Sequence, residues 1–173
     1  MRLEVHRRLT ELSEETGKEY GKLVQKLLGV AFLDAGVEAL TDRSTQGIDL
    51  ELELDGVAHA LEVKTTEGGK IRLGVKDVDG LRAREQGGAH GYVAVLGSRL
   101  TDEWLFARFH PGELAPSLSY TVTQLRPYRD RHLERVVLDT FPNAVLEHAS
   151  AAAARGQRGL DEVLARHPRY RRA

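Results

Sequence analysis

Two runs of alternating polar and apolar residues, separated by Asp55-Gly56, constrain the fold of this chain more than any other feature. Every second residue is apolar across residues 48–54, and the same alternation continues across residues 57–64. A period of two is typical of a β-strand that packs one face on the core. Asp-Gly is the strongest short signal for a two-residue type I′ turn, so the two runs predict an antiparallel hairpin.

A two-residue turn also predicts the register of the hairpin. Leu54 would face Val57, and pairs counted outward would bring Asp49 directly opposite Glu62, with Cβ atoms ~4.5–5.5 Å apart. One face would carry the charged side chains Asp49, Glu51, Glu53, Glu62 and Lys64. The other face would be apolar apart from His59, with Ile48, Leu50, Leu52, Leu54, Val57, Leu61 and Val63 packed on the core. A change of one residue in the turn would break this pairing.

Two carboxylates that face each other across a hairpin destabilise it unless a positive charge compensates them. Mg²⁺ is a natural compensation, because it prefers oxygen ligands and is held by one or two carboxylates together with water and phosphate oxygens. Lys64 points to the same side as Glu62, where it would polarise a phosphate or help to deprotonate a bound water. The alternative is a hairpin with a solvated face, on which Lys64 only neutralises Glu62.

The remaining sequence predicts helices on both sides of this hairpin. The expected helices span residues 3–15, 17–33, 77–86, 127–138, 142–154 and 160–166, and the further strands span 71–75, 92–96 and 104–109. The 17–33 segment has a clear apolar stripe and is expected to cover the apolar face of the hairpin. This order of elements is that of a mixed α/β domain with a helical C-terminal extension.

Composition excludes several classes of protein. The chain has 173 residues, of which 41% are hydrophobic, so one domain can bury a sizeable core. The absence of cysteine excludes disulfides, thiolate metal sites and cysteine nucleophiles. No apolar run is long enough to span a bilayer, and the charged N-terminus lacks a signal-peptide core. We therefore expect a cytoplasmic protein that has no membrane partner.

Charge is distributed unevenly, although the net charge is only −1. The first 60 residues are acidic, whereas residues 155–173 carry six arginines against Asp161 and Glu162. This asymmetry fits an acidic site and a basic contact surface on one molecule. A solvated C-terminal helix and tail would explain the arginines equally well.

The order of these motifs resembles the PD-(D/E)xK nuclease superfamily, in particular its Holliday-junction resolvase-like and Mrr-like branches. The matching pieces are Gly47-Ile48-Asp49 on one strand and Glu62-Val63-Lys64 on the next, preceded by a helix that contains Glu19. The match covers residues 15–97, and Gly47-Ile48 stands where a proline often precedes the aspartate. The resemblance implies a restriction-endonuclease-like αβββαβ core, with a mixed sheet flanked by helices, in a domain of residues 1–125. Residues 126–173 would form a helical extension packed on the same domain.

The resemblance also implies a site in which Asp49, Glu62 and the Val63 carbonyl hold Mg²⁺ or Mn²⁺. Glu19 continues the apolar stripe of its helix, so it would complete the site as a further ligand and catalytic residue. An equal alternative is a capping box, with Thr16 as N-cap and Glu19 as the third helical residue. The two roles would compete for one carboxylate.

Several residues beside this site are candidates for contact with nucleic acid. Lys70, Arg72 and Lys76 flank the loop after Lys64, where basic side chains would attract a polyanion. Arg82 and Arg84 would contact phosphates or be solvated. Gln86, or its neighbour Glu85, would border the active site as a polar residue of the corresponding helix does in the family, unless it lies at a solvated helix end.

The leading hypothesis is a Mg²⁺- or Mn²⁺-dependent DNA endonuclease in which Asp49, Glu62, Lys64 and Glu19 are catalytic. The alternative is a catalytically inactive nuclease-fold module that binds nucleic acid or a partner protein. A homodimer would let two sites cut two strands, and the apolar residues Trp104, Leu105, Phe106 and Phe109 would then line an interface. An ordinary core strand is the preferred interpretation of that segment.

Overall fold

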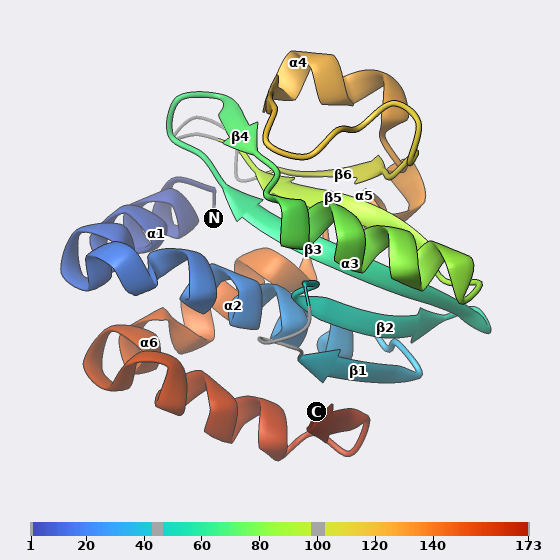
Figure 1. Cartoon of the computed structure of the whole chain (residues 1–173). Helices are drawn as coiled ribbons and strands as arrows, with labels where there is room; N and C mark the ends of the chain where they lie inside the picture. The colour runs from blue at the N-terminus through green and yellow to red at the C-terminus, as the bar shows by residue number, and fades with distance from the viewer. Residues whose placement is uncertain (1, 43–46, 98–102, 173) are drawn as a thin grey trace.

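A six-stranded mixed sheet forms the centre of the computed structural model, and helices cover both of its faces (Figure 1). The structure describes residues 2–42, 47–97 and 103–172. The strands in spatial order are β6 (Trp104–Arg108), β5 (His90–Leu96), β3 (Val57–Thr65), β2 (Leu50–Leu54), β1 (Ala39–Asp42) and β8 (Tyr170–Arg172). The β3–β5 and β1–β8 pairs are parallel and the other neighbours are antiparallel.

The hairpin of β2 and β3 has the predicted turn and register. Asp55 and Gly56 have φ angles of 54° and 72°, as a type I′ turn requires at both of its central positions. Leu54 pairs with Val57, and the ladder continues to Leu50 opposite Leu61. Turn chemistry therefore determines the alignment of the two strands that carry the candidate site.

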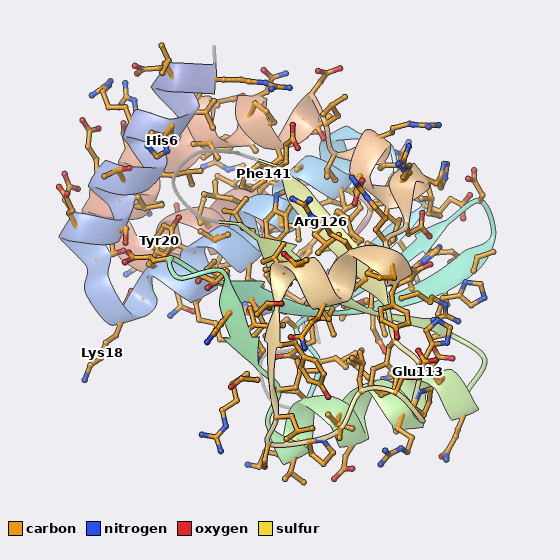
Figure 2. All side chains as sticks on the ribbon, turned by 90° about the horizontal axis from the view of Figure 1, so that it is seen from above. His6, Lys18, Tyr20, Glu113, Arg126 and Phe141 are labelled. Carbon is orange, nitrogen blue, oxygen red and sulfur yellow. The ribbon has the colours of Figure 1, made fainter. Side chains whose placement is uncertain are left out.

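Three helices form the layer on one face of the sheet. They are α1 (Arg2–Thr16), α2 (Tyr20–Asp34) and α6 (Thr140–Ala165), with α2 packed against both the sheet and α6 (Figure 1). Phe141 near the start of α6 is fully buried and points into the interior, whereas Lys18 projects outward (Figure 2). Leu50, Leu52, Leu61 and Val63 face this layer, as the alternation predicted.

A second apolar cluster fills the opposite face, under α3 (Val75–Gln86) and a small ribbon of β4 (Lys70–Arg72) and β7 (Ser119–Thr121). Ile48 belongs to this second cluster, so its predicted place beside Leu50 on the α2 face is wrong. The charged face of the hairpin is accordingly covered in part by α3, where Arg84 pairs with Glu51 at 2.7 Å.

The C-terminal segment contains both helix and strand. The short elements α4 (Val122–Leu125), η2 (Arg126–Tyr128) and α5 (Arg131–Val136) lead into α6, which has non-helical φ/ψ angles at Gly156. The three helices expected after residue 126 are thus replaced by η2, α5 and one long, kinked α6. Strands β1, β7 and β8 were not predicted, and β8 returns the chain to the edge of the sheet beside β1.

Two further expectations concern membranes and the 104–109 segment. Across the described residues, no helix combines the length and apolarity needed to cross a bilayer. Trp104, Leu105, Phe106 and Phe109 are buried within the chain, so the core-strand interpretation is confirmed and these side chains do not line a free surface.

Candidate metal centre

Asp49 and Glu62 are two of the few buried charged side chains of the described structure, with exposed fractions of 8% and 5%. Asp49 directly precedes β2, and Glu62 lies in the middle of β3. Asp49 Oδ2 accepts a hydrogen bond of 2.9 Å from the Val63 backbone N–H. This bond holds the Asp49 carboxylate against the strand that carries Glu62.

The backbone at Asp49 departs from the predicted register. The paired ladder stops at Leu50 opposite Leu61, and the Asp49 N–H also donates to the Leu61 carbonyl at 2.9 Å. Two successive residues therefore oppose one, in the manner of a β-bulge, which re-aims side chains and shifts the alternation by one residue. The predicted direct opposition of Asp49 and Glu62 is wrong in this respect, and the same shift explains why Ile48 faces α3.

The two carboxylates nevertheless act strongly on each other. Burial, followed by the negative charge of Asp49, raises the pKa of Glu62 from 4.5 to about 8. Lys64 opposes this shift but does not cancel it. Ionised Glu62 is therefore disfavoured in the protein as it stands, and a divalent ion at the site would favour the ionised form of this carboxyl group.

Lys64 is held between two carboxylates. Its Nζ lies 2.7 Å from Glu62 Oε1 and 2.7 Å from Asp77 Oδ2. Burial disfavours the charged ammonium, but these carboxylates outweigh burial and raise the pKa of Lys64. Lys64 is therefore a fixed positive charge beside Glu62, on the side of α3.

Asp77 is a site residue that the sequence prediction missed. It is the third residue of α3, and its carboxylate also accepts from the Gly74 N–H at 2.9 Å in a capping arrangement. The Gly74-x-x-Asp77 spacing before a helical segment was the available signal. Helix capping thus places a carboxylate where it orients Lys64.

Lys22 is the second missed residue. Its Nζ lies 2.8 Å from Asp49 Oδ1, and it comes from the first turn of α2. The side chain is 42% exposed, so the ammonium both neutralises Asp49 and reaches solvent. The apolar stripe of α2 predicts the buried face of that helix but does not distinguish Lys22 from its other lysines.

Glu19 is not brought to the carboxylate pair. It is exposed, in the short 3-10 helix η1 (Gly17–Glu19), and its Oε2 lies 3.2 Å from the position that a Cβ would occupy at Gly156. The predicted continuation of the buried stripe through Glu19 is therefore wrong. The capping prediction is wrong as well, because Thr16 makes no capping bond and its hydroxyl donates to the Leu12 carbonyl at 2.6 Å.

The predicted basic residues divide into two groups. Lys70 and Arg72 on β4 and Lys76 on the first turn of α3 are exposed near the end of the sheet at which β3 finishes. Arg82 pairs with Asp79 at 3.4 Å, and Arg84 pairs with Glu51. The first group is exposed to solvent, whereas the second forms ion pairs within the protein.

Gln86 lies at the far end of α3 from this site. It is exposed and nine residues beyond Asp77, a separation of about 13.5 Å along a helix axis. Its neighbour Glu85 binds Arg108 and the Gly91 N–H. Neither residue is placed at the border of the carboxylate pair.

A close approach of two glycines positions the segment before Asp49. Gly47 has a φ of 74°, and a Cβ at Gly80 would overlap the Gly47 carbonyl oxygen. Only glycines allow the chain to pass this near the start of α3. The Gly47-Ile48-Asp49 motif therefore reflects both a left-handed backbone and a tight contact with α3.

The donor set fits a hard divalent cation held with help from water and substrate. Within the described ranges, no group of three or more His, Asp or Glu side chains is arranged to bind a metal ion by itself. Mg²⁺ is typically held by one or two carboxylates, several waters and phosphate oxygens. Asp49 and Glu62 supply that number of carboxylates.

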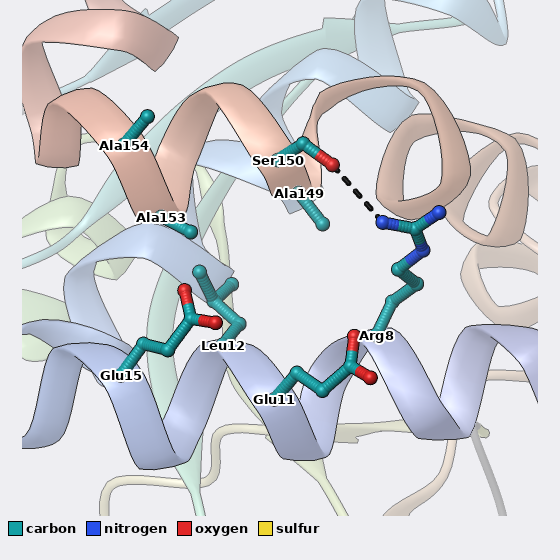
Figure 3. Close-up of a pocket in the computed structure, with 8 residues that line it drawn as sticks. All are labelled: Arg8, Glu11, Leu12, Glu15, Ala149, Ser150, Ala153 and Ala154. Atoms are coloured by element: carbon teal, nitrogen blue, oxygen red, sulfur yellow. Dashed lines mark hydrogen bonds between the residues drawn. The ribbon is translucent and has the colours of Figure 1, made fainter.

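Clefts elsewhere in the molecule are separate from this pair. One of about 300 Å³ lies between α1 and α6, where Arg8 donates to the Ser150 hydroxyl at 3.0 Å (Figure 3). Its walls include Glu11, Glu15 and small alanine side chains of α6 (Figure 3).

Ten solved chains are similar in structure to this protein. No protein-family model matches the sequence, and neither does any curated protein. The structure is similar to Hjc, a Holliday junction resolvase of the archaeal hyperthermophile Archaeoglobus fulgidus, with a TM-score of 0.49 and 22% sequence identity. The similarity covers 61% of this chain and 86% of that chain. By its own order of elements, this chain has the predicted mixed α/β architecture, in which α2, β1, β2, β3, α3 and β5 follow one another around the sheet, extended by a C-terminal helix and strand.

Proposed function

We propose that this protein is a Mg²⁺- or Mn²⁺-dependent endonuclease that hydrolyses phosphodiester bonds in DNA. The observation that carries the proposal is the buried pair of Asp49 and Glu62, two carboxyl groups close enough for the charge of one to raise the pKa of the other. Lys64 stands beside the pair as a fixed ammonium. Carboxylates, a hard cation and a positioned lysine form a set suited to phosphoryl chemistry.

Asp49 and Glu62 would hold the ion together with the Val63 carbonyl. The Val63 N–H already bonds Asp49, and in an extended strand the carbonyl of the same residue points to the same side, where it would reach the same ion. The bound ion would supply Lewis acidity and lower the pKa of its water. Glu62 must lose its proton for this role, because a carboxylate binds metal in its ionised form.

Lys64 would orient the attacking water or stabilise charge on the phosphoryl oxygens. Asp77 keeps its ammonium in place, so the donor needs little rearrangement when substrate arrives. Lys22 would be released from Asp49 as the ion binds, and its partly exposed ammonium would then meet the same phosphate. Both lysines are positioning and charge-stabilising groups in this scheme.

DNA would approach over the exposed basic residues Lys70, Arg72 and Lys76. Non-specific contacts of this kind bind backbone phosphates and weaken as salt increases. The likeness to a protein described as a Holliday junction resolvase makes branched DNA one substrate to test. A homodimer, which light scattering would detect, remains a prediction.

The test is cleavage of linear, branched and single-stranded DNA in Mg²⁺ or Mn²⁺, with EDTA as the metal-free control. Asp49→Asn and Lys64→Met should abolish cleavage, and each variant should still show a cooperative thermal unfolding transition, at a lower midpoint for Lys64→Met because its partner carboxylates lose their cation. Glu53→Gln is the matched control, because Glu53 is an exposed carboxylate on β2, the strand that follows Asp49, and this variant should cleave DNA normally. Full EDTA-sensitive cleavage by Asp49→Asn would overturn the assignment.

The alternative function is a nuclease-fold module that binds DNA or a protein without cutting. It would be favoured if the parent binds DNA with a steep salt dependence but gives no product with any DNA form or metal. The presence of both carboxylates and Lys64 in one place favours the enzyme.

A further inference from the structure

Helix α2 carries two buried polar side chains in a predominantly apolar sequence. Gln25 and Lys26 have exposed fractions of only 2% and 7%. Burying an amide or an ammonium is costly unless its polar groups are bonded. Both side chains have hydrogen-bond partners: those of Gln25 include Asp49, and those of Lys26 are two other carboxylates.

Gln25 contacts Asp49 by two routes. Its Nε2 donates to the Asp49 backbone carbonyl at 3.2 Å and to Asp42 Oδ1 at 2.9 Å. Its Oε1 accepts from Lys22 Nζ at 2.9 Å, and Lys22 in turn binds Asp49 Oδ1. One buried amide therefore holds both the main chain of Asp49 and the cation on its carboxylate.

Lys26 extends these contacts to the C-terminal segment. Its Nζ lies 2.6 Å from Asp42 Oδ2 and 2.7 Å from Asp161 Oδ1. Asp42 is on β1, and Asp161 is on α6, far from the hairpin in sequence. Asp161, Lys26, Asp42 and Gln25 thus form a continuous chain of polar contacts that ends on Asp49.

We propose that Gln25, Lys26 and Asp161 are positioning residues that fix Asp49, so that α6 helps to set the geometry of the candidate metal centre. The bulge at Asp49 leaves this residue outside the regular ladder, so its placement depends on such contacts. We call this chain of polar contacts from Asp161 to Asp49 the relay. It rests on the proposed function only because it treats Asp49 as a metal ligand. Outer-shell partners of metal ligands typically change metal affinity or activity by about 10–100-fold when they are removed.

The experiment compares Gln25→Met, Asp161→Asn and the control Glu162→Gln in the full chain. Glu162 neighbours Asp161 on α6 and pairs with Arg155, outside the relay. Mn²⁺ affinity is measured by calorimetry. We expect Gln25→Met to weaken Mn²⁺ binding about tenfold or more and Asp161→Asn to weaken it by a smaller factor, while Glu162→Gln binds as the parent does.

A metal-free measurement separates this proposal from the proposed function. The Val63 N–H bonds Asp49 Oδ2, so hydrogen exchange at the Val63 amide reports the position of that carboxylate. Gln25→Met and Asp161→Asn should lower protection at Val63 more than at the other amides of β3. A uniform loss of protection would indicate only lower global stability and would overturn the relay.

Continuity of the relay gives a final criterion. Effects of contacting residues in one network are non-additive, so the Gln25→Met/Asp161→Asn double variant should lose little beyond Gln25→Met alone. Independent, additive losses would overturn the relay. If the parent binds no Mn²⁺ while Val63 protection still falls selectively, the relay stands and the metal-dependent function fails.

Discussion

Lys64 and Asp77 form an ion pair of 2.7 Å that joins β3 to the first turn of α3. The same Asp77 carboxylate caps its helix through the Gly74 N–H. A single side chain therefore ties the start of a helix to the ammonium beside Glu62. This relationship makes α3 part of the candidate site, although its predicted contribution, Gln86, lies at the other end of the helix.

The first prediction concerns the hold of Asp77 on Lys64. Asp77→Asn keeps a side-chain oxygen for the cap but removes the charge that fixes the ammonium. We expect kcat for DNA cleavage to fall about 10- to 100-fold, because misplaced catalytic groups lose rate steeply. Asp79→Asn, two residues along and exposed, is the control and should cleave normally. Equal rates for the two variants would contradict this role.

The second prediction is a pH dependence of stability in EDTA. Burial beside Asp49 raises the pKa of Glu62 to about 8, so between pH 4.5 and 8 the folded state binds more protons at this site than the unfolded state does. The free energy of unfolding contributed by Glu62 therefore falls as the pH rises through that interval. Thermal unfolding at pH 5 and pH 8.5 should show a loss of at least a few degrees that Glu62→Gln largely removes.

Bound Mg²⁺ should oppose the loss of stability that Glu62 causes as the pH rises. Because the ionised carboxylate binds the cation, Mg²⁺ should raise the unfolding midpoint more at pH 8.5 than at pH 6. Glu62→Gln should lose this difference. A pH-independent Mg²⁺ effect in the parent would argue against Glu62 as a ligand.

The third prediction concerns the glycine contact before Asp49. Gly80→Ala places a methyl group on the Gly47 carbonyl and must push the two segments apart. We expect a destabilisation of about 1–3 kcal/mol in chemical denaturation, together with weaker Mn²⁺ binding. Gly68→Ala is the matched control, since a Cβ there meets no atom within 4 Å. Normal metal binding by a folded Gly80→Ala protein would show that this contact does not position Asp49.

The fourth prediction concerns acid stability at the opposite end of the hairpin. His59 is buried, its Nδ1 has no hydrogen-bond partner among the described residues, and burial lowers the pKa of its imidazole below 6.5. The folded state then binds fewer protons than the unfolded state, so the stability that neutral His59 contributes is present above pH 6.5 and is lost as the pH falls. In the His59→Leu variant, the thermal unfolding midpoint should change less between pH 7.5 and pH 5.5 than it does in the parent. The control variant His110→Gln, at an exposed histidine, should keep the pH dependence of the parent.

The sequence by itself determined the features that depend on neighbouring residues. Asp55-Gly56 specified a type I′ turn, and this turn specified the pairing from Leu54–Val57 to Leu50–Leu61. The apolar periodicity of 17–33 indicated the helix that covers the sheet. Such signals can be read from sequence because turn conformation and amphipathic burial are local properties.

Only the tertiary structure decided which side chains reach the carboxylate pair. A bulge at Asp49 moved it out of register, α2 presented Lys22 there in place of Glu19, and the cap of α3 supplied Asp77. The buried link from Asp161 to Asp49 joins residues more than 100 positions apart. Contacts of this kind arise from how helices and strands pack, and no local pattern along the chain encodes which charged residue will face which.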